Sequence, residues 1–242
     1  MTTKAPISAG LRIPAICPSS NAPPVDQIVV VPYDAAWPQR FKVESQLIQM
    51  ALADLQPVVE HIGSTSVPGL AAKPTIDMLV GVHSLADFAR HADLLIAYGY
   101  EYIPEYERVL PDRRFFKRVV RGVRTHHVHV VEFGGLYWRR YMAFRDSLRR
   151  DAGLAARYAE LKRSLAARHR FDRDGYTNAK TGFVESVLAR CPLRGAGRPA
   201  TVNTAAASCG ARRYLAERAE AKTSAPTAHG GLRFRPHFGF AS

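Results

Sequence analysis

The chain has 242 residues, of which 47% are hydrophobic, and a formal net charge of +13 at pH 7. This length and composition suffice for one sizeable hydrophobic core. The longest apolar stretches are shorter than the roughly 20 residues of a membrane span, and the N-terminus lacks the basic segment and apolar block of a secretory signal. The three cysteines form no CxxC pair, so the sequence indicates no zinc or disulfide framework and favours a cytoplasmic protein.

Composition divides the chain into three parts. Residues 1–25 are rich in Pro, Ser and Ala, and residues 193–242 are rich in Ala, Gly and Arg without hydrophobic periodicity. Both segments are predicted to be disordered tails, because they cannot bury enough apolar surface to fold. Residues 26–192 carry the periodic apolar pattern of one folded domain. Much of the excess positive charge lies in the tails, so we interpret it as solvated charge and do not expect specific nucleic-acid binding.

Apolar and β-branched runs bounded by turn residues predict the strands. In chain order these are Gln27–Pro32, Pro57–Ile62, Ile76–Val82, Tyr100–Ile103, Arg113–Val120 and Arg124–Glu132. Helical spacing predicts a helix that begins at Pro38, because proline suits the first turn, and another that Ser84 caps and Gly99 ends.

The C-terminal part of the domain has helical periodicity from Gly134 onward. One helix is predicted around Leu154–Leu165, and a last one around Phe183–Leu188, capped by Thr177. Strands alternating with helices and followed by helices predict an α+β fold: a small mixed sheet flanked by helices, with a helical C-terminal part.

A turn rich in hydroxyl groups and glycine joins the two strands 57–62 and 76–82. Its glycines let the backbone approach a ligand closely, while its hydroxyls, amides and one lysine can hold phosphate oxygens. The alternative is an ordinary polar loop, and the turn lacks the Gly-Lys-Ser/Thr ending of a P-loop. The candidate phosphate-binding residues are Gly63, Ser64, Thr65, Ser66, Gly69 and Lys73.

A single acid, Asp77, lies in the apolar strand that follows the turn. Side chains alternate along a strand, so Asp77 and Leu79 share one face while Met78 lies on the other. A carboxylate in an apolar strand is costly unless it is paired, hydrogen-bonded or bound to a metal. It is therefore a candidate metal ligand or catalytic residue; the alternative is a salt bridge, with Lys73 or with an arginine.

Two histidines, His127 and His129, point to the same side of the later strand 124–132, whereas Glu132 points to the other. They can ligate a metal or neutralise phosphate, and His129 can act as a base; the alternative is a pair of hydrogen-bonded core histidines. Further along the chain, Arg145 and Lys162 can reach a triphosphate, although solvated helix faces explain isolated basic residues equally well.

Several segments together resemble the GrpB family over about Val29 to Cys191. The resemblance implies a nucleotidyltransferase-like fold of the polymerase-beta type, in which Gly63 and Ser64 form the Gly-Ser turn and Asp77 is the first metal-binding carboxylate. The second acid of such a site falls on Leu79. The matching segments are Val31–Pro38, His61–Asp77, His127–Val130, Phe144–Arg149 and Tyr158–Lys162.

These features favour an enzyme that binds a nucleoside triphosphate with Mg²⁺ and transfers a nucleotidyl or pyrophosphoryl group to an unknown acceptor. The predicted metal ligands are Asp77, His127 and His129. Because a two-metal site needs several shared carboxylates, the leucine at position 79 also favours a nucleotide-binding module without turnover. A third hypothesis is a metal-dependent phosphoesterase built on the histidines.

Overall fold

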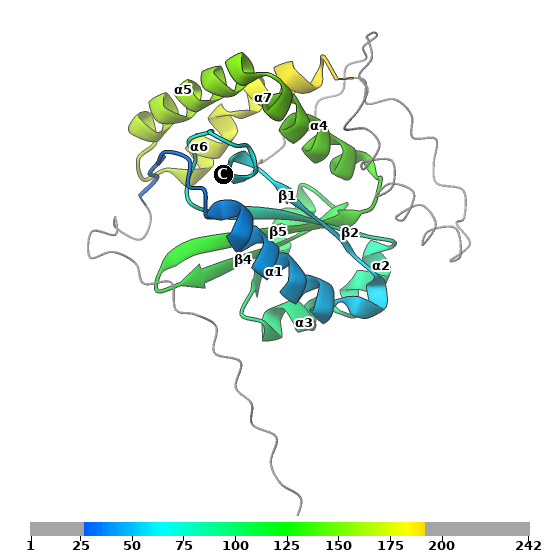
Figure 1. Ribbon diagram of the computed structural model, residues 1–242. Coiled ribbons are helices and arrows are strands. Elements are labelled where there is room, and N and C mark those ends of the chain that lie inside the picture. The colour runs from blue at the N-terminus through cyan, green and yellow to red at the C-terminus, as the bar shows by residue number, and fades with distance from the viewer. Residues whose placement is uncertain (1–26, 192–242) are drawn as a thin grey trace, which may run out of the picture.

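The computed structural model describes residues 27–191, so both predicted tails lie outside the described residues. The described chain places one five-stranded sheet between two groups of helices, as Figure 1 shows. The predicted α+β class, a small mixed sheet with flanking helices and a helical C-terminal part, is confirmed.

The sheet has the strand order β1-β2-β5-β4-β3. The central strands β2 and β5 are parallel, and the other neighbouring pairs are antiparallel. In the register of the parallel pair, Asp77 lies beside His127 and Leu79 beside His129. The strands are β1 Val58–Ile62, β2 Ile76–Val82, β3 Glu101–Tyr102, β4 Arg113–Val120 and β5 Val123–Glu132.

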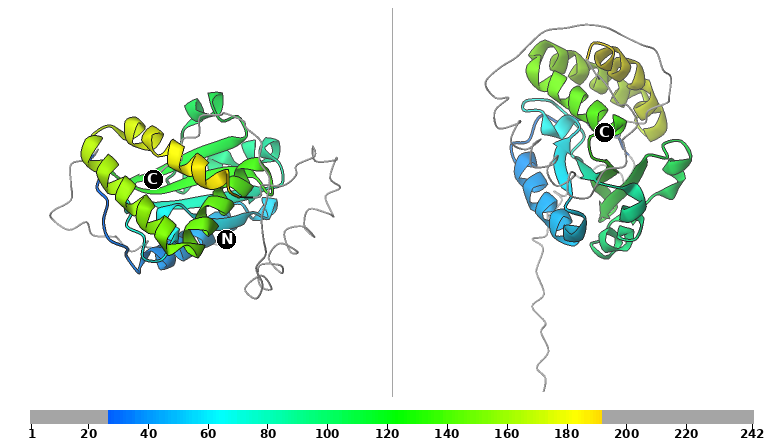
Figure 2. Two further views of the ribbon diagram at one scale, coloured as in Figure 1. Left: turned by 90° about the horizontal axis from the view of Figure 1, so that it is seen from above. Right: turned by 90° about the vertical axis from the view of Figure 1, so that its right-hand side faces the viewer.

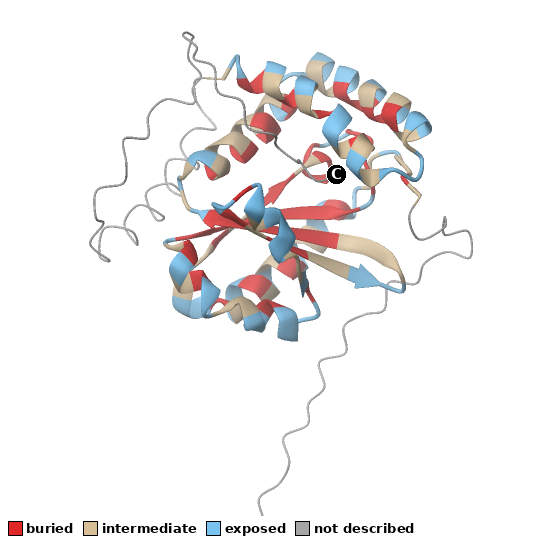
Figure 3. Ribbon diagram, turned by 180° about the vertical axis from the view of Figure 1, so that it is seen from behind, coloured by how far each residue is buried: buried red, intermediate tan, exposed pale blue. Residues whose placement is uncertain are grey.

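Three helices cover one face of the sheet: α1 (Trp37–Ala51), α2 (Leu85–Ala89) and α3 (Ala92–Ala97). The side chains of Met78 and Val80 point to this face and pack in one hydrophobic cluster with residues of these helices. Every residue of β2 is buried, and Figure 3 shows the same for the middle of the sheet. Burial on both faces explains why β2 reads as a continuous apolar run.

The C-terminal helices cover the opposite face, as Figure 2 shows from above. Leu79 and Val131 point to this side and share a second cluster with residues of these helices. The face that carries Asp77 is therefore enclosed between the sheet and the C-terminal helices. These helices are α4 Leu136–Arg150, α5 Ala152–Arg168, α6 Arg173–Ala179 and α7 Thr181–Leu188.

Three single turns of 3₁₀ helix complete the described chain. They are η1 Ala53–Leu55, η2 Ser64–Ser66 and η3 Pro104–Arg108. The turn η2 follows β1 directly, so the hydroxyl-rich segment starts at the end of that strand.

Most predicted elements are found where expected, and three differ. In the predicted strand Gln27–Pro32 only Val31 pairs, through an isolated bridge to Ala72. The helix that Ser84 caps ends at Ala89 and a second one begins at Ala92, because the imidazole Nδ1 of His91 lies 3.0 Å from the Asp87 carbonyl oxygen at the break.

The predicted cap of the last helix was also wrong. Thr177 lies inside α6, whose N-terminal cap is Asp172; its carboxylate accepts a hydrogen bond from the Gly175 amide at 2.8 Å. The last helix, α7, has Lys180 at its N-cap and no side-chain hydrogen bond to its first amides.

No helix within residues 27–191 has both the length and the apolar character needed to cross a membrane. The cytoplasmic location stays a prediction.

Candidate functional site

The turn after β1 brings the backbone against the only acid of β2. Gly63 has φ +68°, a left-handed conformation that favours glycine. A Cβ atom at this position would overlap Asp77 Oδ2 and stand 3.0 Å from Asp77 Cβ. The predicted Gly-Ser turn and the predicted carboxylate are therefore in direct contact, and glycine is required both for the backbone angle and for the space.

Two hydroxyl groups of the turn are used to hold the turn itself. Thr65 Oγ1 lies 3.0 Å from His61 Nε2, and Ser66 Oγ donates to the Gly63 carbonyl oxygen at 2.6 Å. The His61 ring is stacked on Phe41 of α1, with centroids 4.6 Å apart, and burial lowers the pKa of His61 to about 3. Thr65 and Ser66 thus shape the turn, whereas the Ser64 side chain lies by the Tyr158 hydroxyl of α5.

Asp77 is paired with His127 of the neighbouring strand. The distance from Asp77 Oδ1 to His127 Nδ1 is 2.9 Å, and the two side chains are buried. An ionised carboxylate only accepts hydrogen bonds, so Nδ1 of the imidazole carries a hydrogen. Burial lowers the pKa of His127 despite this bond. In the neutral ring the lone pair therefore belongs to Nε2, which has no hydrogen-bond partner among the described residues.

His129 has the opposite arrangement. Arg113 Nη1 lies 3.2 Å from His129 Nδ1, and the Tyr141 hydroxyl lies 3.3 Å from the same nitrogen. Since a guanidinium only donates, Nδ1 holds the lone pair and Nε2 carries the hydrogen. Burial, followed by the charge of Arg113, keeps the pKa of His129 well below its usual value. The predicted role of His129 as a base does not suit this geometry, because its lone pair already accepts from Arg113.

Three buried lysines lie on the same side of the sheet as Asp77, and their side chains are packed against two tyrosine rings. Lys73 Nζ and Lys180 Nζ stand 5.1 and 4.3 Å from the ring centre of Tyr176. Lys162 Nζ stands 4.8 Å from the ring centre of Tyr158 and donates to the Ala71 carbonyl oxygen at 2.5 Å.

Burial lowers the pKa of all three lysines, and the charge of Asp77 acts on each of them and offsets part of this lowering. Together with its histidine partner they form one buried group, which we call the acid–lysine cluster. It consists of Asp77, His127, Lys73, Lys162 and Lys180.

Arg145 does not belong to this cluster. Its guanidinium donates to Glu60 Oε2 at 2.7 Å and to the His61 carbonyl oxygen at 3.0 Å, which ties α4 to β1. A second carboxylate, Asp146, accepts from Nε at 2.8 Å. The predicted phosphate contact of Arg145 is therefore replaced by a structural ion-pair network.

The predicted metal ligands are only partly brought together. Among residues 27–191, no group of three or more His, Cys, Asp and Glu side chains is arranged to hold a metal ion. Asp77 and His127 are in contact, whereas His129 turns to Arg113 and Tyr141. Glu132 is exposed, and Leu79 is buried among apolar side chains at the position of a second acid. A metal site made of the three predicted residues is thus not formed by the protein alone.

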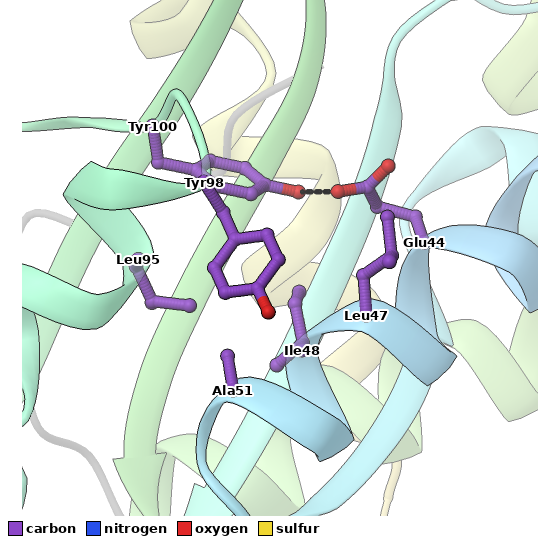
Figure 4. A pocket seen from close by; sticks show the side chains of 7 residues that line it. All are labelled: Glu44, Leu47, Ile48, Ala51, Leu95, Tyr98 and Tyr100. Atoms are coloured by element: carbon purple, nitrogen blue, oxygen red, sulfur yellow. Dashed lines mark hydrogen bonds between the residues drawn. The ribbon is translucent and has the colours of Figure 1, made fainter. Parts of the chain in front are cut away.

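The recess shown in Figure 4 lies on the other face of the sheet, between α1 and α3. Its one acid, Glu44, accepts a hydrogen bond from the Tyr100 hydroxyl at 2.7 Å and another from Arg118 at 2.8 Å. The remaining lining is mostly apolar. Because the carboxylate of Glu44 is already held by Tyr100 and Arg118, we place the candidate site at the acid–lysine cluster.

Comparison with known proteins agrees with the resemblance seen in the sequence. The model of the family described as "GrpB protein" matches residues 27–190. The chain belongs to the GrpB family. The predicted family is thus confirmed, and its match covers nearly all of the described residues.

Relatives of this GrpB-family chain come from diverse bacteria. A UPF0157 protein of Pseudomonas aeruginosa is 42% identical over 171 residues, which is 68% of this chain and 68% of that protein. The glutamate-rich protein GrpB of Alkalihalophilus pseudofirmus is 30% identical over 166 residues, 67% of this chain and 94% of the relative. The crystal structure of the conserved protein GrpB from Enterococcus faecalis has a TM-score of 0.60 at 37% identity, covering 66% and 94% of the two chains.

Two features of this family member agree with the nucleotidyltransferase-like fold that the resemblance implied. A Gly-Ser turn precedes the strand that carries the acid, and the neighbouring parallel strand β5 presents a further side chain, His127, to that acid.

The sequence interpretation missed Lys180 and the two tyrosines as site residues. Each lysine follows a tyrosine by four residues on the buried stripe of a C-terminal segment: Tyr158 and Lys162, then Tyr176 and Lys180. Residues four apart lie on one side of a helix. A tyrosine followed four residues later by a lysine is thus the sequence feature that the two pairs share, and the packing of the C-terminal helices over the sheet is what buries these lysines.

The buried lysines predict that the protein becomes more stable as the pH rises from about 7 to about 10. Burial lowers the pKa of Lys73 to about 8, that of Lys162 to about 7, and that of Lys180 well below its usual value. In this window the unfolded chain binds more protons than the folded chain, so the free energy of unfolding increases with pH.

Above pH 10 the trend should reverse, because burial raises the pKa of Tyr158 and Tyr176 and the folded chain then holds protons that the unfolded chain loses. Urea denaturation at one-unit pH steps measures both trends. Lys162→Met should reduce the slope between pH 7 and 10. A free energy of unfolding that stays flat or falls from pH 7 to 9.5 would contradict this account.

Proposed function

We propose that this GrpB-family protein binds a nucleoside triphosphate together with Mg²⁺ and transfers its nucleotidyl group to an acceptor hydroxyl. The observation that carries the proposal is the contact between the Gly63 backbone and the Asp77 carboxylate beside a histidine and three buried lysines. In phosphoryl-transfer sites a carboxylate holds the metal ion, and a glycine turn lets the backbone approach the substrate closely. Cationic side chains bind the phosphate oxygens.

Asp77 suits Mg²⁺ only as part of a shared site. Magnesium is usually bound by one or two carboxylates, while waters and substrate phosphates supply the remaining oxygens. Asp77 Oδ1 is engaged by His127, and Oδ2 faces the turn at Gly63. We therefore assign Asp77 as the protein's ligand to a magnesium ion that arrives with the triphosphate. The bound ion would neutralise charge on the phosphoryl oxygens.

His127 is the better candidate for the base than His129. In the transfer step the acceptor oxygen bonds to the α-phosphorus, the bond from that phosphorus to the bridging oxygen breaks, and pyrophosphate leaves with the electron pair. The hydroxyl proton goes to the lone pair of His127 Nε2, which the bond to Asp77 orients. Nε2 of His129, which carries a hydrogen, is suited to donate to an oxyanion instead.

Lysine ammonium groups supply the phosphate contacts in this proposal. The Lys73 and Lys162 assignments made from the sequence are kept, because both side chains lie in the cluster with Asp77. Thr65, Ser66 and Arg145 are reassigned to structural roles, since their side chains hold the turn and tie α4 to β1.

Isothermal titration with ATP, GTP, CTP and UTP, with and without Mg²⁺, tests the proposal. We expect at least one triphosphate to bind, with an affinity about tenfold or more higher when Mg²⁺ is present, which corresponds to about 1.4 kcal/mol. Mg²⁺ without nucleotide should bind weakly. Analysis of the mixture by ³¹P NMR should then show pyrophosphate once an acceptor is supplied. Failure of all four nucleotides to bind would overturn the proposal.

A nucleotide-binding module without turnover is the second candidate. It is favoured by one observation. Position 79, where a second carboxylate would help to bind a second metal ion, is occupied by a leucine buried in an apolar cluster. Metal-dependent nucleotide binding with no pyrophosphate release over a panel of hydroxyl acceptors would favour this candidate. The phosphoesterase hypothesis is less suited to the geometry, because it needs both histidines on one metal ion and His129 is turned to Arg113.

A further inference from the structure

The three lysines of the acid–lysine cluster are enclosed to an unusual degree. Lys162 and Lys180 have 0% of their surface exposed and Lys73 has 7%. Lysine is almost never fully buried unless it is paired. Lys180 Nζ has no hydrogen-bond partner among the described residues, and it lies 4.3 Å from the Tyr176 ring centre. A buried amine without a hydrogen-bond acceptor can bind a ligand that supplies an acceptor.

The charges around these lysines are out of balance. Asp77 is the carboxylate that acts on all three, and the other charged groups that act on them are basic. Arg173 and Arg124 act on Lys73, and Arg163 acts on Lys162. One carboxylate cannot neutralise three ammonium groups, and an uncompensated buried charge is strongly unfavourable. The cluster therefore needs either neutral amines or an added anion.

We propose that Lys73, Lys162 and Lys180 form a polyphosphate site that is closed in the free protein, and that a bound polyphosphate chain supplies the hydrogen-bond acceptor that Lys180 lacks and the negative charge that the three buried amines lack. Lys180, which nothing in the sequence pattern of the turn indicates, contributes the innermost contact. This inference deepens the proposed function, on which it rests, by assigning the residues that hold the leaving phosphates. Because the three side chains are enclosed, a ligand can reach them only if the helices that cover them move; α6, which carries Tyr176, and α7 lie on either side of Lys180.

Proton uptake follows from the chemistry of the two states. Burial, together with neighbouring basic groups, lowers the pKa of Lys73 to about 8 and that of Lys162 to about 7. Burial and the charges of the other two lysines lower the pKa of Lys180 well below its usual value. Phosphate oxygens favour the ammonium form. Near pH 8 the bound complex should therefore hold more protons than the separate protein and ligand.

Inorganic tripolyphosphate without Mg²⁺ is the probe that isolates this site. The full chain is titrated at pH 8 in two buffers of different ionisation enthalpy, so that the difference in heat gives the number of protons exchanged. We expect uptake of about one proton or more per tripolyphosphate. Lys180→Met should weaken binding by about tenfold or more and reduce the uptake. The control is Lys42→Met, which removes an exposed lysine of α1 and should change neither quantity.

Folding of the variants is checked by urea denaturation. Methionine replaces a buried amine by an apolar group of similar length, so Lys180→Met should be as stable as the wild type or more stable. Lys180→Gln serves as a second variant if methionine disturbs packing. Absence of tripolyphosphate binding, absence of proton uptake, or equal binding by wild type, Lys180→Met and Lys42→Met would each overturn the inference.

The outcomes separate this inference from the proposed function. A protein that binds tripolyphosphate with proton uptake, but binds no nucleoside triphosphate, would contradict the proposed function and uphold the lysine site. A protein that binds Mg²⁺-nucleotide through Asp77, with no effect of Lys180→Met, would uphold the proposed function and contradict the lysine site.

Discussion

Replacement of Gly63 by alanine is expected to lower the free energy of unfolding by about 2–4 kcal/mol and to remove Mg²⁺-dependent nucleotide binding. Two effects add. The backbone at Gly63 has φ +68°, where a side chain is strained, and the new Cβ would overlap Asp77 Oδ2. Because Asp77 is buried against β5, it cannot move aside without breaking its bond to His127. Urea denaturation and isothermal titration with Mg²⁺-nucleotide measure the two consequences.

Gly69 offers a matched control in the same loop. Its φ is +77°, but a Cβ there would meet nothing within 4 Å. Gly69→Ala should therefore carry only the backbone strain of a left-handed alanine, about 1 kcal/mol, and keep nucleotide binding. The difference between the two variants measures the contact with Asp77. Equal losses of stability and binding in both variants would show that the close approach of Gly63 to the carboxylate has no role.

The sheet was the most predictable part of the structure. The bounds of β2 and β4 agree with the prediction at both ends, because β2 is a buried apolar run and turn residues bound β4. The predicted Ser84 cap is also confirmed, since Ser84 Oγ accepts from the Asp87 amide at 3.2 Å. These features depend on residues close in the sequence, where spacing carries the information.

The C-terminal helices show where local patterns are insufficient. The predicted cap at Thr177 was wrong because Thr177 lies inside α6, and the last helix, α7, begins after Lys180 without a side-chain cap. Only the fold reveals the burial of Lys180, since it depends on the packing of the C-terminal helices over the sheet. A lysine on a helix surface and a lysine under a helix layer have the same local sequence, and composition alone favours the solvated one.

Part of the candidate site was predictable, because it depends on neighbouring strands and on the alternation of side chains along them. The contact of the turn with Asp77 follows from adjacent strands β1 and β2, and the side shared by His127 and His129 follows from alternation. The different partners of the two histidines do not follow from the strand pattern. Arg113 comes from β4, and it decides which nitrogen of His129 keeps the lone pair. An HxH motif therefore cannot be assigned as a metal site until the neighbouring strands are known.

Neutralising the single acid of β2 should have the largest effect on function with little effect on the fold. In Asp77→Asn the amide oxygen can still accept the hydrogen bond from His127 Nδ1, so the contact between β2 and β5 is kept. The charge that attracts Mg²⁺ is lost, and with it the only carboxylate that acts on all three lysines. We expect affinity for Mg²⁺-nucleotide to fall to that measured without Mg²⁺, and any transfer to slow by about a hundredfold or more.

Glu60→Gln is the matched control for this change. Glu60 lies on the neighbouring strand β1, and its carboxylate pairs with Arg145 of α4 at 2.7 Å. Its neutralisation should lower the free energy of unfolding because Arg145 then loses its charged partner, while Mg²⁺-dependent binding is kept. Titration and urea denaturation of both variants thus give opposite patterns: Asp77→Asn loses binding and keeps stability, and Glu60→Gln does the reverse. If Asp77→Asn bound Mg²⁺-nucleotide as tightly as the wild type, the metal would be held elsewhere and the assignment of Asp77 would be wrong.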